Sequence, residues 1–250
     1  MSKQALTLVT VTKDDPSGLA RTLTSCAGLR RAGVQHLVVD GGADRDGTAN
    51  LAAAADGDVT VVYQQSRGIA AAFNEGLAHA QGEWIWFLNG GDAIHDDLDP
   101  SWLLSLLSRT RAQVITGALQ FDGEPVARSK PHLSYQWPLI SCWLAHPATL
   151  VRRERLLAVG GFDPRWRIAM DYDLWLRLLQ PDVTVDVLSV PFARFDVTGV
   201  SERPETRAAA RREEMRIVVK HGWRLVWAGP WLCLRLARRL GQGLLGAWRQ

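Results

Sequence analysis

Apolar segments rich in β-branched residues alternate with helix-forming segments through the first 90 residues, and this alternation limits the fold more than any other feature. Strands are predicted at Leu6–Thr12, Val34–Val39, Val59–Tyr63 and Trp84–Leu88. Helices are predicted at Leu19–Leu29, Thr48–Ala55 and Ile69–Ala80. Strands that alternate with helices form a parallel sheet covered on both faces. The sequence therefore predicts an α/β fold.

The second half of the chain is less regular, and its predicted elements are mixed. They are a helix at Pro100–Thr110, a strand at Gln113–Phe121, a mixed segment at Ser141–Arg152, an amphipathic helix at Met170–Leu179 and a strand at Val183–Leu188. No internal repeat accompanies them. We expect this half to complete the sheet begun by the first.

Polar and glycine-rich clusters follow three of the predicted strands. They are Lys13-Asp14-Asp15, Asp40-Gly41-Gly42 and Asn89-Gly90-Gly91-Asp92. Ligands of open α/β sheets bind beyond the carboxyl ends of the strands. We therefore expect the three clusters to line one crevice.

Several classes of protein lack their sequence signatures here. No G-x-G-x-x-G motif follows the first strand, which argues against a dehydrogenase, and no G-x-S-x-G motif indicates a hydrolase. The three cysteines, Cys26, Cys142 and Cys233, lie far apart without C-x-x-C spacing. This spacing indicates neither a disulfide framework nor a zinc site, and it favours a reducing compartment.

The C-terminal region is basic and rich in tryptophan, whereas the whole chain carries a net charge of only +3. Four tryptophans lie there, at Trp223, Trp227, Trp231 and Trp248. Basic charge alone would suit nucleic acid as well, but tryptophan favours an anionic membrane surface. No segment approaches the roughly 20 apolar residues that span a bilayer, and the N-terminus lacks a signal-peptide cleavage site. We expect a cytoplasmic protein with a tail on the inner face of the membrane and no nucleic-acid partner.

Four stretches together carry a resemblance to a known family. They are LTLVTVTKDDPSGLARTLTS, LVVDGGADRDGT, RGIAAAFNEGLAHAQGEWIWFLNGGD and AHPATLVRRERLLAVGGFDPRWRIAMDYDLWLRL. Their order and spacing resemble the inverting family 2 glycosyltransferases, which have the GT-A fold (a Rossmann-like, mostly parallel sheet) and use nucleotide-diphospho-sugar donors. The V-D-G-G and F-L-N-x-G-D pieces look like bacterial exopolysaccharide transferases of the colanic-acid type. The resemblance implies inverting sugar transfer to a glycan acceptor, expected to be lipid-linked, in cell-surface polysaccharide synthesis.

The resemblance also implies a donor site. The turn from Asn89 to Asp92 stands where the family has a D-x-D-D metal motif, so Asp92 would bind a divalent cation, Mg²⁺ or Mn²⁺, that bridges two phosphates. Mg²⁺ accepts one or two carboxylates when phosphates and water complete its shell. Asp40 would accept a hydrogen bond from the base. The implied donor-binding residues are Thr10, Thr12, Asp14, Asp40, Gly41, Arg67, Asn89, Gly90, Gly91 and Asp92. Ordinary turn capping is an equally good interpretation of Asp14, Asp44 and Asp46.

Asp171, at the start of a predicted helix, matches the family's catalytic carboxylate. As a general base it would remove the proton of the attacking hydroxyl. Asp173 stands four residues before Arg177 and predicts an ion pair instead. His146 and Gly161 match positions near the acceptor, although a buried core histidine is an alternative for His146. Asn74 is predicted to hydrogen-bond or pack.

The predicted domains are a GT-A catalytic domain at residues 1–202 and a basic, amphipathic helical tail at 203–250. The tail lies either on an anionic membrane surface or against the protein. A different class of function also fits: a non-catalytic nucleotide-sugar-binding or scaffold protein would explain why Asn89, Gly91 and Ala71 replace acidic residues of the family. A nucleotidyltransferase shares the sheet, but its G-x-G-T-R-like loop does not occur here.

Overall fold

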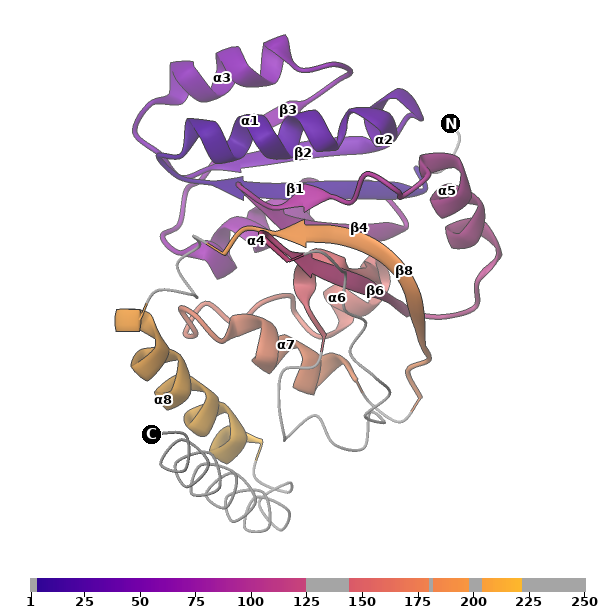
Figure 1. Ribbon diagram of the computed structural model, residues 1–250. Coiled ribbons are helices and arrows are strands. Elements are labelled where there is room, and N and C mark those ends of the chain that lie inside the picture. The colour runs from indigo at the N-terminus through magenta and orange to yellow at the C-terminus, as the bar shows by residue number, and fades with distance from the viewer. Residues whose placement is uncertain (1–3, 125–143, 180–181, 198–203, 222–250) are drawn as a thin grey trace, which may run out of the picture.

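The computed structural model describes residues 4–124, 144–179, 182–197 and 204–221. Within them the chain forms one curved sheet of eight strands, ordered β3-β2-β1-β4-β7-β6-β8-β5 (Figure 1). The strands are β1 Leu6–Thr12, β2 Gln35–Asp40, β3 Thr60–Tyr63, β4 Trp84–Asn89, β5 Ala93–Ile94, β6 Val114–Phe121, β7 Thr149–Arg152 and β8 Val185–Phe195. The helices are α1 Pro16–Ser25, α2 Ala27–Arg31, α3 Arg45–Ala54, α4 Ile69–His79, α5 Pro100–Arg109, α6 Arg153–Ala158, α7 Met170–Leu178 and α8 Pro204–Lys220, with a 3₁₀ turn η1 at His146–Ala148.

Strands β1, β2, β3 and β4 are parallel to one another, as expected for strands that alternate with helices along the chain. β1 lies between β2 and β4, and β2 pairs with β3. Their carboxyl ends therefore meet at one edge, where Thr12 lies beside Asp40 in the register and Val11 lies beside Asn89. The predicted convergence of the three polar clusters follows from this pairing.

The other half of the sheet is mixed. β7 runs antiparallel to both β4 and β6, β8 runs parallel to β6, and β5 runs antiparallel to β8. The pairing of β4 with β7 is important for the site, because it brings η1, which directly precedes β7, next to the end of β4.

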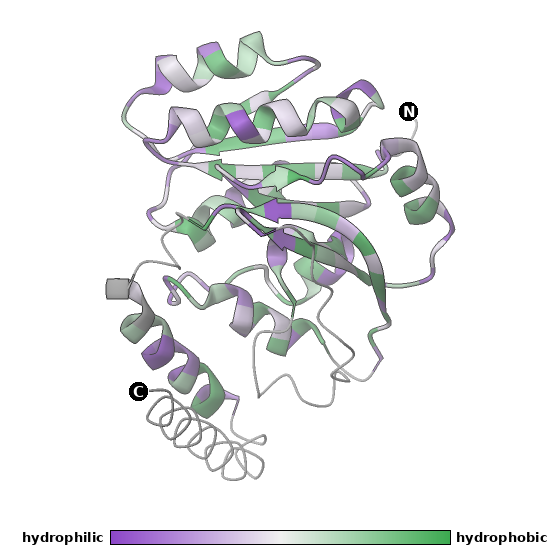
Figure 2. Ribbon diagram, viewed as in Figure 1, coloured by the Kyte–Doolittle hydropathy of each residue, from purple (hydrophilic) through white to green (hydrophobic). Residues whose placement is uncertain are grey.

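The core has two main layers, one on each face of the sheet, and alternate residues of β1 supply both. Val9 and Val11 pack with α4, α6, α7 and α8 on one face. Leu6 and Leu8 pack with α2 and α5 on the other. The central strands are accordingly apolar along most of their length (Figure 2). A smaller cluster joins Leu19 and Leu23 of α1 to β2, with α3 outside it.

Helix α8, the first part of the predicted tail, packs against α7 (Figure 1). Ile217 and Val218 of α8 are buried in the same core layer as α7. The rest of the predicted tail beyond residue 221 lies outside the described residues, as do Cys142 and Cys233. No helix in the described part of the chain is long and apolar enough to cross a bilayer.

The predicted α/β fold is confirmed, with three local corrections. The single helix predicted at Leu19–Leu29 is two helices, α1 and α2, which meet at Cys26. The strand predicted at Val183–Leu188 continues to Phe195 past Pro191, because the β6–β8 register shifts between Thr116 and Ala118 and admits the proline at an irregularity. The two-residue strand β5 was not predicted, because it is too short to show a period.

Candidate active site

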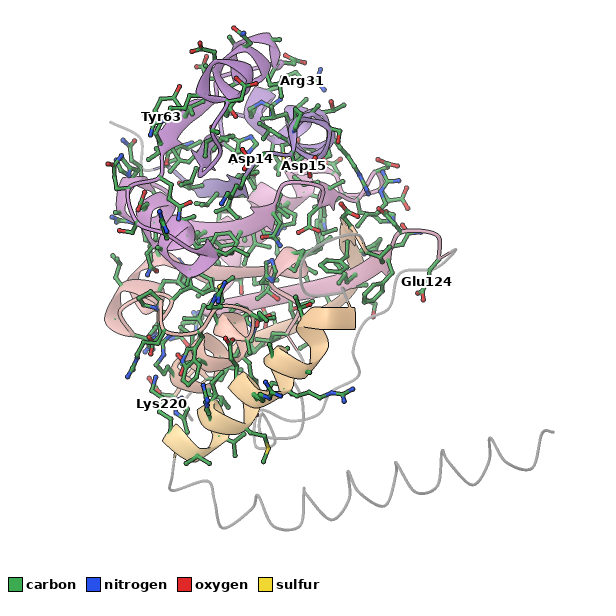
Figure 3. All side chains as sticks on the ribbon, turned by 90° about the vertical axis from the view of Figure 1, so that its left-hand side faces the viewer. Asp14, Asp15, Arg31, Tyr63, Glu124 and Lys220 are labelled. Atoms are coloured by element: carbon green, nitrogen blue, oxygen red, sulfur yellow. The ribbon has the colours of Figure 1, made fainter. Side chains whose placement is uncertain are left out.

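A pocket lies at the carboxyl edge of β1 and β2. It is lined by Thr12, Asp14, Asp15, Pro16, Asp40, Gly42, Asp44, Gly47 and Thr48. Figure 3 looks onto this edge and shows Asp14 and Asp15 next to each other. Three of the predicted donor-binding residues, Thr12, Asp14 and Asp40, therefore share one pocket, and Gly41 adjoins it.

Asp40 is the buried acid of this pocket. Its side chain is 3% exposed, and its Oδ1 accepts a hydrogen bond from the N–H of Gly42 at 2.7 Å. Its Oδ2 accepts no hydrogen bond from any residue in the described ranges. A buried oxygen without a donor is costly unless a ligand supplies one. This carboxylate can therefore accept an N–H group from a molecule bound in the pocket.

The other acids of the pocket hold its loops. Asp15 and Asp44 cap α1 and α3, each accepting a backbone N–H three residues later at 2.9 Å. Asp14 has a positive φ of 51° and accepts the N–H of Ala43 at 2.9 Å, which ties the loop after β1 to the loop after β2. The capping interpretation of Asp44 is thus what the structure shows, and α3 begins three residues earlier than predicted because of that cap.

Thr10 lies elsewhere. It is fully buried, its backbone pairs within the sheet, and its hydroxyl lies 2.9 Å from Nε2 of His36. The other ring nitrogen of His36 contacts Arg30 at 3.1 Å. Thr10 is therefore not among the residues that line this pocket, because it lies two residues deeper in β1 than Thr12.

The turn from Asn89 to Asp92 closes on itself through Asp92. The carboxylate of Asp92 is 1% exposed, and its Oδ2 accepts the N–H of Asn89 at 3.1 Å. Its Oδ1 accepts the N–H of Asp196 at 3.2 Å, which joins the turn to the end of β8. Burial raises the pKa of Asp92 to about 6, against the opposing influence of His146 and the two N–H groups. A buried acid with a raised pKa is poorly compensated for its negative charge.

Two residues that the sequence did not single out complete this turn. The hydroxyl of Thr22 accepts the N–H of Gly91 at 3.0 Å and donates to the carbonyl of Asp92 at 2.6 Å. The carboxylate of Asp196 lies against Gly91, where a Cβ atom would come 2.4 Å from its Oδ2. Gly91 also has a φ of 103°, so both its backbone and its surroundings require glycine. A second acid thus stands beside the single acid of the motif.

His146 lies between this turn and the predicted catalytic acid. Its Nε2 is 3.0 Å from Nδ2 of Asn89, and its Nδ1 is 3.9 Å from Oδ2 of Asp171. The Oδ1 atom of Asp171 accepts the N–H of Tyr172 at 2.8 Å. The side chains of His146 and Asp171 are 14% and 26% exposed, so both are reachable from the surface of the site. The structure brings these three predicted residues together.

Arg67 is exposed in the loop before α4. Glu75 holds this loop by accepting the backbone N–H groups of Gln65 and Ser66 at 2.9 to 3.1 Å. Gly68, with a φ of 103°, begins α4 without a side-chain cap. The N-terminal backbone of α4 is thus left available beside Arg67, an arrangement that suits an anion.

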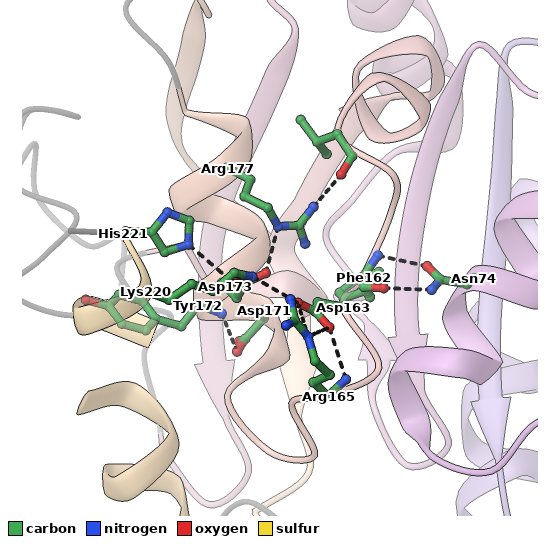
Figure 4. Close-up of polar contacts among 11 residues, drawn as sticks. Asn74, Phe162, Asp163, Arg165, Asp171, Tyr172, Asp173, Arg177, Lys220 and His221 are labelled. Atoms are coloured by element: carbon green, nitrogen blue, oxygen red, sulfur yellow. Dashed lines mark hydrogen bonds and ion pairs between the residues drawn. The ribbon is translucent and has the colours of Figure 1, made fainter. Parts of the chain in front are cut away.

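Helices α7 and α8 meet around Asp173 (Figure 4). Its fully buried carboxylate pairs with Arg177 at 2.7 Å, Lys220 at 2.9 Å and His221 at 3.2 Å. Burial alone would raise the pKa of Asp173, but these three partners hold it well below its usual range. The predicted Asp173–Arg177 ion pair is therefore confirmed, and Lys220 at the end of α8 and His221 directly after it are two further partners that the sequence did not predict.

Glu213 of α8 holds the loop that leads to Asp171. Its carboxylate accepts the backbone N–H groups of Arg167, Ile168 and Ala169 at 2.9 to 3.1 Å. These groups precede the first turn of α7. The position of Asp171 thus depends on a residue that lies 42 positions further along the chain, within the predicted tail.

Gly161 and Asn74 hold the loop between α6 and α7 against α4. Asn74 exchanges two hydrogen bonds with the backbone of Phe162, at 2.7 and 2.8 Å (Figure 4). Gly161 has a φ of 67°, and a Cβ atom there would lie 2.4 Å from Oδ1 of Asn74. The hydrogen-bonding prediction for Asn74 is confirmed, and Gly161 is required for that contact.

Comparison with known proteins agrees with this geometry. The sequence profile of the family described as Glycosyl transferase family 2 matches residues 7–170. An uncharacterized glycosyltransferase of Mycobacterium tuberculosis is 27% identical over 212 residues, which cover 83% of this chain and 80% of that protein. The pre-mycofactocin glycosyltransferase of Mycobacterium tuberculosis is 31% identical over 198 residues, 72% of this chain but only 40% of that protein.

Among solved structures, the chain is similar to the crystal structure of S. aureus TarS, with a TM-score of 0.65 at 16% identity. The match covers 87% of this chain and 39% of TarS. A shorter form of TarS in complex with UDP also has a TM-score of 0.65, at 16% identity, over 86% of this chain and 64% of that one. Likeness at this identity shows the fold, which is GT-A. Because the family profile spans more than half of the sequence, the chain belongs to glycosyltransferase family 2.

Proposed function

We propose that this glycosyltransferase moves one sugar from a nucleotide-diphosphate donor to a hydroxyl group of a glycan, with inversion at the anomeric carbon. Asp171 serves as the general base. The observation that carries the proposal is the placement of Asp171 and Asn89 on opposite sides of one imidazole, at 3.9 and 3.0 Å. A base beside the donor turn lets a hydroxyl attack the sugar from the face opposite the leaving phosphate.

The donor nucleotide is UDP in this proposal. The unpaired Oδ2 of Asp40 needs an N–H donor, and the ring N–H of uracil supplies one. The structurally similar TarS has been crystallised with UDP and with UDP-GlcNAc. Thymine and guanine also carry a ring N–H, so dTDP- and GDP-sugars are the competitors that an experiment must include.

The turn at Asp92 fits a divalent cation that brings part of its own shell. Within the described ranges no cluster of three His, Cys, Asp or Glu side chains is arranged to hold a metal alone. Asp92 has a raised pKa, and Asp196 lies beside the same turn. Together they offer two carboxylates to an ion whose other ligands are phosphate oxygens and water. Such an ion would neutralise the charge that develops on the leaving diphosphate.

The acceptor in this proposal is a lipid-linked glycan, and the product is a cell-surface polysaccharide of the exopolysaccharide type. The supporting observation is the order of motifs in the sequence together with the basic, tryptophan-bearing C-terminal region. That region would bring the protein to the cytoplasmic face of an anionic membrane, where such acceptors are exposed.

The donor assignment is tested by thermal unfolding in the presence of UDP-, dTDP- and GDP-sugars, each with Mg²⁺ or Mn²⁺. A ligand at about 100 times its Kd stabilises the native state by about 2.7 kcal/mol. UDP-sugars should raise the unfolding temperature and the others should not. Stabilisation by GDP-sugars alone would contradict the assignment.

The catalytic assignment is tested by Asp171→Asn, which keeps the shape of the side chain but cannot accept a proton. We expect kcat for UDP release from a UDP-sugar to fall by about 10²–10⁴, with UDP affinity unchanged. A variant with near-normal turnover would show that another group is the base. A wild type that binds UDP-sugars without releasing UDP in the presence of membrane-derived acceptors would favour the non-catalytic alternative.

A further inference from the structure

His146 connects two parts of the site that come from distant segments of the chain. Asn89 ends β4, Asp171 lies in the first turn of α7, and His146 begins η1. The imidazole contacts Asn89 through Nε2 and faces Asp171 through Nδ1. It is held there by the β4–β7 pairing and by an edge-on contact with Phe73, at 5.9 Å between ring centroids.

The contact with Asn89 determines where the imidazole carries its proton. The Nδ2 atom of an amide can only donate, so Nε2 of His146 must accept and cannot hold a hydrogen. A neutral imidazole then carries its hydrogen on Nδ1, the nitrogen that faces Asp171. The other tautomer would turn a lone pair toward the carboxylate and would repel it.

We infer that His146 is a positioning residue that orients the carboxylate of Asp171, and that Asn89 fixes the tautomer that makes this possible. The 3.9 Å separation needs to shorten by less than 1 Å for Nδ1–H to donate to Oδ2 of Asp171. The N–H of Tyr172 already holds Oδ1. With both oxygens held, the plane of the Asp171 carboxylate is fixed before an acceptor hydroxyl binds.

The inference rests on the proposed role of Asp171 as the base, and it gives the turn a second task. Asn89 replaces an acid of the family motif, and here its amide directs the imidazole.

Two amide variants of His146 test its contact with Asp171 and its contact with Asn89 separately. His146→Asn places an amide N–H near the position of Nδ1, toward Asp171, and loses the contact with Asn89. His146→Gln places an amide near the position of Nε2, toward Asn89, and leaves nothing at Nδ1. We expect His146→Gln to lower kcat for UDP release from a UDP-sugar by about 10²-fold, and His146→Asn to keep kcat within about tenfold of the wild type.

Both variants should leave UDP affinity and the unfolding temperature close to those of the wild type. A purely space-filling role predicts the opposite order, because glutamine fills more of the imidazole volume than asparagine does. Equal turnover of the two variants, or a better glutamine variant, with an active wild type would overturn the inference and leave the proposed function standing. A wild type that never turns over a UDP-sugar would overturn both.

The tautomer can be read without turnover. Nitrogen-15 NMR of the imidazole, assigned by comparison with His146→Gln, should show Nδ1 protonated and Nε2 without a hydrogen. Asn89→Ala should lose this preference. An Nε2-protonated ring in the wild type would contradict the inference directly.

Discussion

Two buried aspartates stand in opposite electrostatic settings. Asp92 and Asp173 are 1% and 0% exposed. In the described part of the chain the carboxylate of Asp92 accepts backbone N–H groups only, and burial raises its pKa to about 6. Burial acts on Asp173 in the same direction, but its hydrogen bonds and ion pairs with His221, Lys220 and Arg177 outweigh it.

This difference distinguishes a carboxylate with a structural role, Asp173, from one that belongs to a binding site, Asp92. The charge of Asp173 is neutralised by the chain itself, so it fastens α7 to α8 and needs nothing further. The charge of Asp92 has no such compensation, and Asp196 adds a second carboxylate beside it. We interpret the surroundings of Asp173 as a complete structural contact between α7 and α8. We interpret the Asp92 turn as a site that a cation and a diphosphate complete.

The largest loss of stability is expected for Asp173→Asn, which disrupts the contact between α7 and α8. Removing one partner of a buried ion pair leaves the others uncompensated, which costs about 3–5 kcal/mol. The matched variant Asp92→Asn should lie within about 2 kcal/mol of the wild type, because relief of the buried charge offsets one lost hydrogen bond. Urea unfolding in EDTA measures both. Equal destabilisation by the two variants would remove the contrast.

The contributions of Asp92 and Asp173 to stability should depend on pH with opposite signs. The folded pKa of Asp92, about 6, exceeds its unfolded value, so its ionisation opposes folding above pH 6. Lowering the pH from 7 to about 4 should therefore stabilise the metal-free wild type over Asp92→Asn by about 2 kcal/mol. The folded pKa of Asp173 is depressed, so its contribution is present above its unfolded pKa, about 3.9, and is lost as the pH falls further. A difference curve without slope between pH 6 and 4 would refute the first statement.

The two regions also differ in how tightly glycine is required. Gly91→Ala meets both a φ of 103° and the carboxylate of Asp196 at 2.4 Å. Gly160→Ala meets a φ of 76° with nothing within 4 Å. Backbone strain costs about 1–3 kcal/mol in both, and only Gly91→Ala should also weaken UDP binding. Calorimetric titration with UDP checks this, and weaker binding by Gly160→Ala would be unexpected.

Glu213→Gln is the mildest change. The amide keeps an acceptor but loses the charge that three backbone N–H groups share, which should cost about 1 kcal/mol. Because these groups lead into α7, kcat should fall several-fold while UDP affinity stays constant. A larger effect on UDP affinity than on kcat would show that α8 acts on the donor side instead.

The regular half of the chain was predictable because local signals determine it. β1 has the predicted bounds, since its β-branched run ends in the polar residues of a turn. Asp40 and the Asn89–Asp92 turn were found because parallel strands must end at one edge. Asp173 was recognised as an ion-pair residue from its spacing to Arg177 within one helix.

The rest depends on contacts between distant segments. Thr22 and Asp196 lie 70 and 104 residues from Asp92, and no local pattern marks either as part of its turn. Glu213 lies within the predicted tail, for which the sequence allowed packing against the protein without indicating which backbone groups Glu213 would hold. The depth of Thr10 was not predictable either, because a position near the end of a polar-tipped strand does not tell how deeply a residue is buried.

The central claim is that the Asp92 turn is completed by a cation that arrives with the donor. Calorimetric titration of UDP into the wild type and Asp92→Asn, with Mg²⁺ and with EDTA, tests it most directly. We predict wild-type binding at least about tenfold tighter with Mg²⁺, equivalent to about 1.4 kcal/mol, and the same weak affinity for Asp92→Asn in both buffers. Equal wild-type affinity in Mg²⁺ and EDTA would contradict the claim.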